Sequence, residues 1–345
     1  MAESDANMMK NYSIWLKVNG LLFMGISVVA YGVKFGLVWH DAGKPLVLSD
    51  LKFHPYYNMI LTIYTVLGFY VFQASADPAK FKPLLSFLMY GSQLAHGIIA
   101  TLAVFAHFEP TYVGPSIFGV IPAEMFGLTN WDKLFVACPF WLVLFGINLY
   151  FAKAALGSPL LPWQVGVPAM DGSQPSAHSY WLKVNGLLFM GISVVAYGFK
   201  FGLVWHDAGK PLVLSDLKFH PYYSMILVIY TVLGFYIFQA SSNPAENKAL
   251  LSLVMYTYEL AHGVIATIAV FNHFEPTYVG SSIFGDIPEE MFGLTNWDKL
   301  FVACPFWFLL FGVNLFFAKK SFGSLLLPWQ LLDSVAYTKV GAGGA

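Results

Sequence analysis

The fold of this protein is decided by an apolar stretch of sequence that occurs twice. Residues 15–57 read WLKVNGLLFMGISVVAYGVKFGLVWHDAGKPLVLSDLKFHPYY, and residues 181–223 repeat them with Val33 replaced by Phe199. The repeat continues, so that Trp15–Gln164 recurs as Trp181–Gln330 at a constant offset of 166 positions, with roughly four positions in five identical. Such self-similarity indicates one structural unit present in two copies. A position at which the copies differ shows what one copy does without.

The composition is typical of a membrane protein. Hydrophobic residues make up 57% and charged residues 11% of the chain, against about 45–50% and about 25% in soluble domains. The basic residues are all lysines, and the net charge of −1 gives no reason to expect nucleic acid as a partner. The sequence also lacks a phosphate-binding glycine loop, a dinucleotide fingerprint and a nucleophile elbow. These features argue against an enzyme.

Each copy contains four apolar segments. They are residues 14–39, 56–74, 83–105 and 134–151 in the first copy, and residues 180–205, 222–240, 249–271 and 300–317 in the second. Their lengths match or approach the span of about 20 residues that crosses a bilayer. The segments do not alternate, and a lipid-exposed backbone must satisfy its own hydrogen bonds, so helices are favoured over strands. We therefore predict an all-α membrane protein with eight transmembrane helices, arranged as two tandem, parallel-oriented four-helix bundles.

Lysines predict the orientation of these helices. Lysines accompanied by few acidic residues lie near the N-terminus, between the second and third segments and after each fourth segment, which places those regions in the cytoplasm. An even number of helices in each copy gives both copies the same orientation. The first ten residues lack the apolar core of a signal peptide. We expect a multi-pass integral protein of a bacterial inner membrane with both termini in the cytoplasm.

Five regions follow from the repeat and the apolar segments. They are an N-terminal cytoplasmic segment (1–12), a first four-helix repeat (13–164), a linker (165–178), a second four-helix repeat (179–330) and a flexible tail (331–345).

Histidines near the predicted outer surface form one candidate site in each copy. The predicted topology brings three of them together in each copy, with carboxylates close by in sequence: His40, His54 and His107, and likewise His206, His220 and His273. Neutral imidazole is a ligand for zinc, copper and iron. Each set is therefore a candidate transition-metal site, and the alternative is that these histidines are interfacial and form hydrogen bonds with loop backbone.

A second candidate site lies within the third predicted helix. His96 precedes His107 by eleven residues, which places it about 16 Å deeper in the membrane. An ionisable residue at this depth is energetically costly, so we expect it to have a function. Gln93 lies on the same helix face, and the second copy has Glu259 and His262 at these positions. These four residues are candidates for binding a haem or a chlorophyll-type pigment; a proton or substrate path and a simple interhelical hydrogen bond are the alternatives.

Asparagines in the first and fourth predicted helices are further polar positions within the apolar segments. They are Asn19 and Asn148 in the first copy, and Asn185 and Asn314 in the second. Asparagine side chains at such positions can form hydrogen bonds between helices. We therefore expect them to connect helices within each copy.

The second and third predicted helices contain a pattern of residues that resembles a known family. In the first copy the pattern consists of Met59, Tyr64, Leu67-Gly68, Ala76-Asp77-Pro78, Leu85, Ser86 and His96. The second copy has Met225, Tyr230, Leu233-Gly234, Pro244, Leu251, Ser252 and His262, with Asn243 in place of the aspartate. The pattern resembles an uncharacterised family of small bacterial four-helix membrane proteins, here as a tandem fusion of two copies. The resemblance implies a four-helix unit with a histidine in its third helix, and it implies no activity.

These features together predict a non-enzymatic integral membrane subunit or scaffold of a larger complex. Its expected partners are the lipid bilayer and other membrane protein subunits or a second copy of itself, and it would hold lipid or a hydrophobic cofactor. One alternative is a redox protein that binds metal, haem or pigment through the repeat histidines. The other is a small-solute transporter or channel.

Overall fold

The computed structural model describes most of the chain. Its described backbone comprises residues 2–42, 55–105, 114–116, 119–121, 124–125, 128–129, 139–165, 176–208, 221–271, 280–282, 285–287, 290–291 and 294–331. Side chains are described over residues 6–28, 58–102, 139–165, 176–194, 224–268 and 305–331. The described backbone includes all eight predicted helices, in whole or in part.

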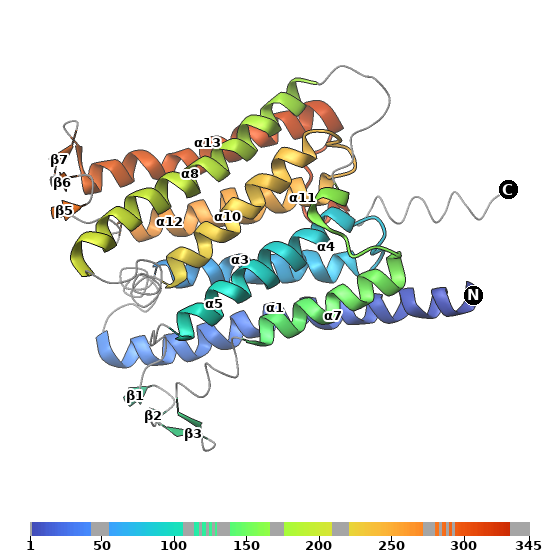
Figure 1. Ribbon diagram of the computed structural model, residues 1–345, viewed down its shortest axis with the longest axis horizontal. Coiled ribbons are helices and arrows are strands. Elements are labelled where there is room, and N and C mark those ends of the chain that lie inside the picture. Colours follow the sequence, from blue (N-terminus) through green and yellow to red (C-terminus); the bar gives the residue numbers. More distant parts are fainter. Residues whose placement is uncertain are drawn as a thin grey trace.

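Helices dominate both repeats (Figure 1). The first repeat contains α1 (Ala2–Ala42), α3 (Pro55–Ala74), α4 (Lys82–Phe87), the π-helix η1 (Leu88–Ala95), α5 (His96–Phe105), α7 (Pro139–Leu156) and the 3-10 helix η2 (Pro162–Gln164). The second repeat contains α8 (Ala177–Ala208), α10 (Pro221–Ala240), α11 (Lys248–Leu253), the π-helix η3 (Val254–Ala261), α12 (His262–Phe271) and α13 (Asn296–Phe322). The all-α class predicted from the sequence is confirmed as the dominant architecture.

Short strands lie between the third and fourth helices of each repeat and form two-stranded antiparallel sheets. In the first repeat they are β1 (Gly114–Ser116) with β2 (Gly119–Ile121) and β3 (Glu124–Met125) with β4 (Leu128–Thr129). In the second they are β5 (Gly280–Ser282) with β6 (Gly285–Ile287) and β7 (Glu290–Met291) with β8 (Leu294–Thr295). The strands of both repeats lie at one end of the molecule and α4 and α11 at the other, so the repeats run in the same direction (Figure 1).

Several helices are longer than their apolar segments. α1 begins at Ala2, and the segment ahead of the apolar run includes the good helix formers Ala2, Glu3, Met8, Met9 and Lys10. α7 continues past Lys153 to Leu156, and α13 past Lys319 to Phe322. Each then ends at a glycine with positive φ, Gly157 at +67° and Gly323 at +66°, the left-handed conformation that terminates many helices. The lysines therefore lie in the last turns of the fourth helices, where they interact favourably with the helix dipole.

Within each repeat the first helix packs along the second, α1 on α3 and α8 on α10. Glycine permits this close approach. A Cβ atom added to Gly20 would lie 2.6 Å from the carbonyl oxygen of Gly68, and one added to Gly186 would lie 2.6 Å from that of Gly234. Only glycine fits where two backbones approach so closely. The fourth helix then packs on the first helix and on the π-helix of the third.

The two repeats are joined by their second and third helices. α3 packs on η3 and α12, and α10 packs on η1 and α5, so each second helix contacts the third helix of the other repeat. The buried apolar residues of both repeats form one continuous core cluster. The junction is therefore packed as closely as a protein interior, and it does not resemble a loose contact between separate bundles.

Two buried hydrogen-bond relays cross this junction. The Ser86 hydroxyl donates to the carbonyl oxygen of Leu160 and lies 2.6 Å from the Tyr236 hydroxyl. A serine hydroxyl has one proton, so Tyr236 is the donor to Ser86. The equivalent relay, with two bonds of 2.6 Å, consists of Tyr70, Ser252 and Leu326. Each tyrosine thus connects the second helix of its own repeat to the third helix of the other repeat and, through the serine, to the backbone that follows that repeat's fourth helix.

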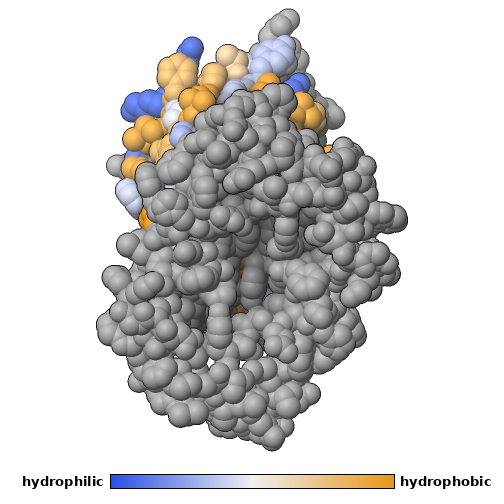
Figure 2. Space-filling model, turned by 90° about the vertical axis from the view of Figure 1, so that its left-hand side faces the viewer, coloured by the Kyte–Doolittle hydropathy of each residue, from blue (hydrophilic) through white to orange (hydrophobic). Residues whose placement is uncertain are grey.

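The outer surface of the bundle is apolar. In the described part of the chain, Pro139–Leu156 and Lys248–Ile268 are long and apolar enough to cross a membrane, while Asn58–Ala74 and Ser224–Ala240 are apolar but shorter. Several large hydrophobic side chains on the first and fourth helices are half or more exposed. Figure 2 looks at the strand end, and the described residues visible along its upper edge are largely hydrophobic, with hydrophilic residues among them.

Candidate functional site

A π-helix followed by a histidine lies at the centre of each repeat. η1 ends at Ala95 and His96 begins α5, while η3 ends at Ala261 and His262 begins α12. π-helices are rare, and they occur mostly as short insertions at functional sites. The sequence predicted an uninterrupted third helix here, because the apolar composition of the segment does not distinguish an i→i+5 hydrogen-bond pattern from an i→i+4 pattern.

Aromatic rings enclose both histidines. His96 is 4% exposed, and its ring centroid lies 5.2 Å from that of Tyr64 and 5.3 Å from that of Trp141. Tyr64 and Trp141 stack on each other at 5.0 Å. In the second repeat, His262 has Tyr230 and Trp307 at 5.4 and 5.0 Å. Each imidazole therefore connects the second, third and fourth helices of its own repeat.

A hydrogen-bond network beside the histidine in the first repeat connects helices. Asn148 donates to the amide oxygen of Gln93 at 3.0 Å and accepts from the indole nitrogen of Trp15 at 2.9 Å. All of Gln93 and Asn148 is buried. The network therefore joins the first, third and fourth helices, as expected for asparagine in an apolar bundle.

The second repeat has the same network with a carboxylate in place of the amide. Glu259 Oε1 accepts from Asn314 at 2.6 Å and from Asn185 at 3.3 Å. Trp181 donates to Asn314 at 2.7 Å. The bond from Asn314 is shorter than its counterpart in the first repeat. The equivalent asparagine of the first helix, Asn19, has no partner for either side-chain polar atom.

Buried polar atoms without a partner gather in both centres. Among the described residues of the first repeat they include both polar atoms of Asn19, Gln93 Nε2 and Tyr64 OH. Among those of the second they include Glu259 Oε2, Asn185 Oδ1, Thr257 Oγ1 and Tyr230 OH, and His96 Nδ1 and His262 Nδ1 belong to the same set. Each unpartnered group costs about 1–3 kcal/mol. Groups of this kind in proteins are usually satisfied by water or by a ligand.

Some of the differences between the two centres are compensating changes in packing. A Cβ atom on Gly91 would lie 2.6 Å from the ring of Phe87. The second repeat has the smaller Leu253 in place of Phe87 and Thr257 in place of Gly91. Phe87 also packs edge-on against Tyr258, at 5.9 Å across the junction. The exchanges around Phe87 therefore fit large side chains together near the axis that relates the repeats.

The structure places the predicted site residues as follows. Gln93 with His96, and Glu259 with His262, lie in the buried centres described above. The asparagine network confirms the interhelical hydrogen bonds expected of Asn148, Asn185 and Asn314. The proposed metal sites (His40, His54, His107, His206, His220 and His273) lie outside the residues whose side chains are described. Within the described residues no three His, Cys, Asp or Glu side chains gather in a metal-binding group.

Three kinds of site residue were not anticipated from the sequence. They are the ring neighbours Tyr64 and Trp141 with their repeats Tyr230 and Trp307, the indole donors Trp15 and Trp181, and His178, which lines a cavity described below. The indole donors carry a signal that could have been used, because Trp15 precedes Asn19 by one helical turn. The ring neighbours come from other helices, so no local spacing points to them.

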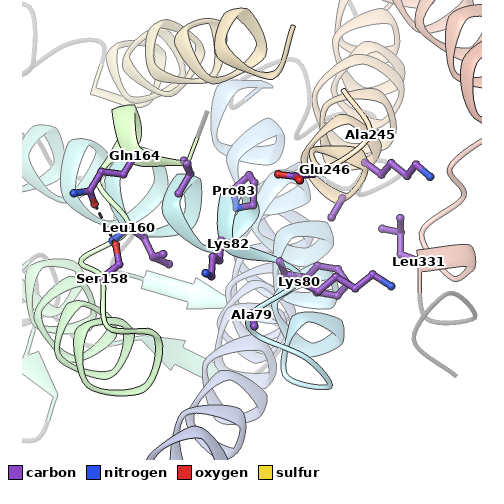
Figure 3. Close-up of a pocket in the computed structure, with 14 residues that line it drawn as sticks. Ala79, Lys80, Lys82, Pro83, Ser158, Leu160, Gln164, Ala245, Glu246 and Leu331 are labelled. Carbon is purple, nitrogen blue, oxygen red and sulfur yellow. Dashed lines mark hydrogen bonds between the residues drawn. The ribbon is translucent and has the colours of Figure 1, made fainter. Parts of the chain in front are cut away.

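A separate cavity of about 660 Å³ lies at the end of the molecule opposite the strands. Figure 3 shows Ser158, Leu160 and Gln164 on one side, Ala245, Glu246 and Leu331 on the other, and Lys82 and Pro83 between them. Lys80, Lys82 and Lys248 line it with a single acid, Glu246. Neither His96 nor His262 lines the cavity, so it is not the cofactor pocket that the sequence predicted beside His96.

Comparison with known proteins identifies no relative: no protein family, no curated protein and no solved structure matches this chain.

Proposed function

We propose that this protein is a non-enzymatic, integral membrane subunit or scaffold that crosses the bilayer eight times. The observation that carries the proposal is a stripe of exposed apolar side chains on the first helix of each repeat. Ile14, Val18, Leu21 and Val28 of α1 are 50–66% exposed, and Tyr180, Val184, Leu187 and Val194 of α8 are 47–66% exposed. Their spacing puts them on one helix face. In water such a face would be a large unfavourable patch, whereas in a bilayer it meets lipid.

The fourth helices extend this apolar surface. Val143 and Tyr150 of α7 are 55% and 59% exposed, and Leu309 and Phe316 of α13 are 63% and 59% exposed. The polar side chains, by contrast, are buried in the two centres. Apolar residues outside and hydrogen-bonded polar residues inside are the arrangement that a helical bundle requires in lipid, because no water there can satisfy polar groups.

The proposed orientation places the α4 and α11 end in the cytoplasm of a bacterial cell and the strands outside. Lys80 and Lys82 lie at the α4 and α11 end. The last turns of the fourth helices, with Lys153, Lys319 and Lys320, lie at the same end. Positively charged residues favour the cytoplasmic side of a membrane. A tandem fusion of two small four-helix membrane proteins has this topology, since each copy begins and ends on the same side.

Cysteine labelling tests the topology. In a protein whose Cys138 and Cys304 are replaced by serine, we expect A79C and A245C to react with a membrane-impermeant thiol reagent only after the inner membrane is opened. T129C and T295C, in β4 and β8, should react in intact spheroplasts. The matched pairs test each repeat separately. Labelling of A79C and T129C from the same side would overturn the proposal.

Site-specific photo-crosslinking tests the role as a subunit. A photoreactive residue at Val18, on the exposed stripe, should produce one reproducible adduct with a membrane protein or with a second copy of the chain. The control position is Leu16, which is fully buried on the same helix and should crosslink only within the chain. Lipid adducts alone at Val18, together with a lone colourless monomer after purification, would contradict a subunit role.

A proton or small-solute path is the second candidate function. The observation that favours it is the group of unpartnered polar atoms around η1 and η3, deep within the bundle. Ionisable residues at such depth often line ion or proton paths. Transport by proteoliposomes would distinguish it from a purely structural role, provided that E259Q and the wild type are compared in the same lipid.

A further inference from the structure

We propose that the second repeat takes up and releases a proton at Glu259, along a path that begins at His178, and that the first repeat has no equivalent site. The inference goes beyond a structural role, because a membrane subunit could fold and assemble without any titrating group in its interior. The proposal rests on the proposed membrane topology only for the side from which the proton arrives. Experiments on Glu259 and experiments on the membrane topology can therefore give opposite results.

The environment of Glu259 favours a proton on its carboxyl group. The carboxyl group is fully buried; Oε1 accepts hydrogen bonds from two asparagines, and Oε2 has no hydrogen-bond partner among the described residues. Asn185 of α8 and Asn314 of α13 are the two donors, Tyr230 of α10 interacts with Glu259 electrostatically, and Tyr258 and His262 contact the Tyr230 ring. No lysine is buried among the described residues. A buried carboxylate without a cation is unfavourable, so a proton on Oε2 is the simplest compensation.

The nearest lysine on the first helix does not supply the missing charge. Lys183 lies two residues before Asn185, but its amino group sits 5.7 Å from the ring centroid of Tyr180, an exposed residue on the outer surface. The carboxyl group therefore has hydrogen-bond donors and no positive partner among the described residues.

A small cavity lies between His178, in the first turn of α8, and the two asparagines that donate to Glu259. Its volume is about 10 Å³, and its polar lining residues are His178, Asn185 and Asn314, with apolar side chains around them. That volume is close to the minimum that holds one water molecule. Asn185 follows His178 by two helical turns, or about 10 Å along the axis. A water here would connect the imidazole with the network around the carboxyl group.

His178 is placed to pass a proton into this cavity. It lies in the first turn of α8, at the end of the molecule with the lysines, and its ring stacks on Phe317 at 5.6 Å. Its Nδ1 is buried and has no partner. An imidazole can accept a proton on one ring nitrogen while it releases another proton from the other nitrogen.

The first repeat lacks both ends of this path. Tyr12 occupies the position of His178, and Gln93 occupies that of Glu259. The connecting residues are retained, because Trp15 and Asn148 form the same hydrogen bonds as Trp181 and Asn314. An amide does not titrate, and a phenol does not release its proton near neutral pH. Two linked differences, at the two ends of one path, separate the repeats.

The step involves only a proton. Water at the helix end delivers it to a ring nitrogen of His178, the other nitrogen releases a proton to the water in the cavity, and that water transfers one to Glu259 Oε2. The carboxylate becomes a neutral carboxyl group, and release follows the reverse course. No electron is transferred and no other bond is broken.

Infrared difference spectroscopy of the reconstituted full-length protein tests the proposal. The measurement is the carbonyl stretching band of a protonated carboxyl group as the pH is raised. We expect the wild type to lose a band that E259Q lacks at every pH. The matched variant Q93E should gain a second such band. Size-exclusion chromatography controls for folding, which E259Q should retain because the first repeat already folds with glutamine in this network.

The path is tested by the rate of the same signal after a pH jump. H178Y, which copies Tyr12 of the first repeat, should slow the change at Glu259 at least tenfold without removing the band. Y12H should leave the wild-type signal unchanged. An E259Q spectrum identical to that of the wild type would overturn the site, and an H178Y rate equal to that of the wild type would overturn the path. A band that responds to added Na⁺ at constant pH but not to pH would also overturn the proton assignment.

Discussion

The first and second repeats share one backbone but differ in what they hold at its centre. η1 and η3 begin and end at equivalent residues, although four of their eight side chains differ, one of them only by the exchange of Leu88 for Val254. Two of the other changes, at Gly91 and Ser92, accompany the loss of the Phe87 ring and adjust packing across the junction. The last, Gln93 to Glu259, exchanges an amide for an acid inside a network whose bonds from tryptophan and from the asparagine of the fourth helix are the same in both repeats. The comparison separates changes that preserve the fold from the one that alters its chemistry.

The largest effects should be equal in the two repeats, because they concern the shared backbone. We expect G20A and G186A each to lower the free energy of unfolding by about 1–3 kcal/mol, since the added methyl group meets backbone atoms of the second helix. Denaturant unfolding in detergent measures this. G25A is the control, because nothing lies within 4 Å of a Cβ there. A G20A variant as stable as G25A would show that the close approach of α1 and α3 is absent.

The next effect should distinguish the repeats. N314L removes a 2.6 Å hydrogen bond to a carboxyl group, and N148L removes a 3.0 Å bond to an amide. At alkaline pH, where Glu259 is ionised, we expect N314L to cost about 1.5–3 kcal/mol and N148L about 0.5–1.5 kcal/mol. Unfolding midpoints provide the comparison. In the E259Q background the two losses should become equal, and a persistent difference would assign the asymmetry to another cause.

A smaller and again symmetric effect is expected at the junction. S86A and S252A each break one relay, which removes the acceptor of a buried tyrosine hydroxyl and the donor to a leucine carbonyl. We expect each to cost about 1 kcal/mol. Y236F in the S86A background should add little, because the relay is already broken. Additive effects of S86A and Y236F would show that these side chains do not interact across the repeats.

The smallest expected effect is a loss of stability at acid pH that arises in the second repeat only. Burial lowers the pKa of His178 from its usual 6.5 to about 4. The unfolded chain therefore binds this proton more tightly, so stability is lost as the pH falls through 6.5 towards 4. Only one imidazole is involved, so we expect the loss to be small. The thermal midpoint of H178Y should fall less between pH 7 and pH 5 than that of the wild type. Equal shifts would contradict a buried neutral imidazole.

Much of the helical framework could be predicted from the sequence. The second segment was expected at residues 56–74, and α3 spans Pro55–Ala74. The ends of the fourth helices were placed too early, because charged residues were taken as their limits while glycines with positive φ end them. The interhelical role of Asn148, Asn185 and Asn314 was also foreseen, whereas the same expectation for Asn19 was wrong, since it has no side-chain hydrogen-bond partner among the described residues. A polar residue in an apolar helix has few ways to satisfy its hydrogen bonds, so its role is strongly constrained.

The partners of the candidate residues could not be predicted in the same way. Nothing in the local sequence indicated that Tyr64 and Trp141 enclose His96, or that Tyr236 reaches Ser86 in the other repeat. The outer histidines still stand as a prediction, since their side chains lie outside the described residues. The proton path was equally hidden, because His178 and Glu259 are 81 positions apart in the chain.

Composition and repetition in the chain were sufficient to establish a helical protein built from two similarly oriented copies. This is because the length and hydrophobicity of each segment, and the number of segments in each copy, can be counted without knowing which segments touch. The contacts of each helix face were settled by folding. Lipid tails are as apolar as leucine, so hydrophobicity does not specify which apolar faces meet. Glycine contacts, hydrogen bonds and ring packing between distant parts of the chain specify which faces meet. These contacts bury Gln93 and Glu259, so that one exchange of side chain makes two different interior sites.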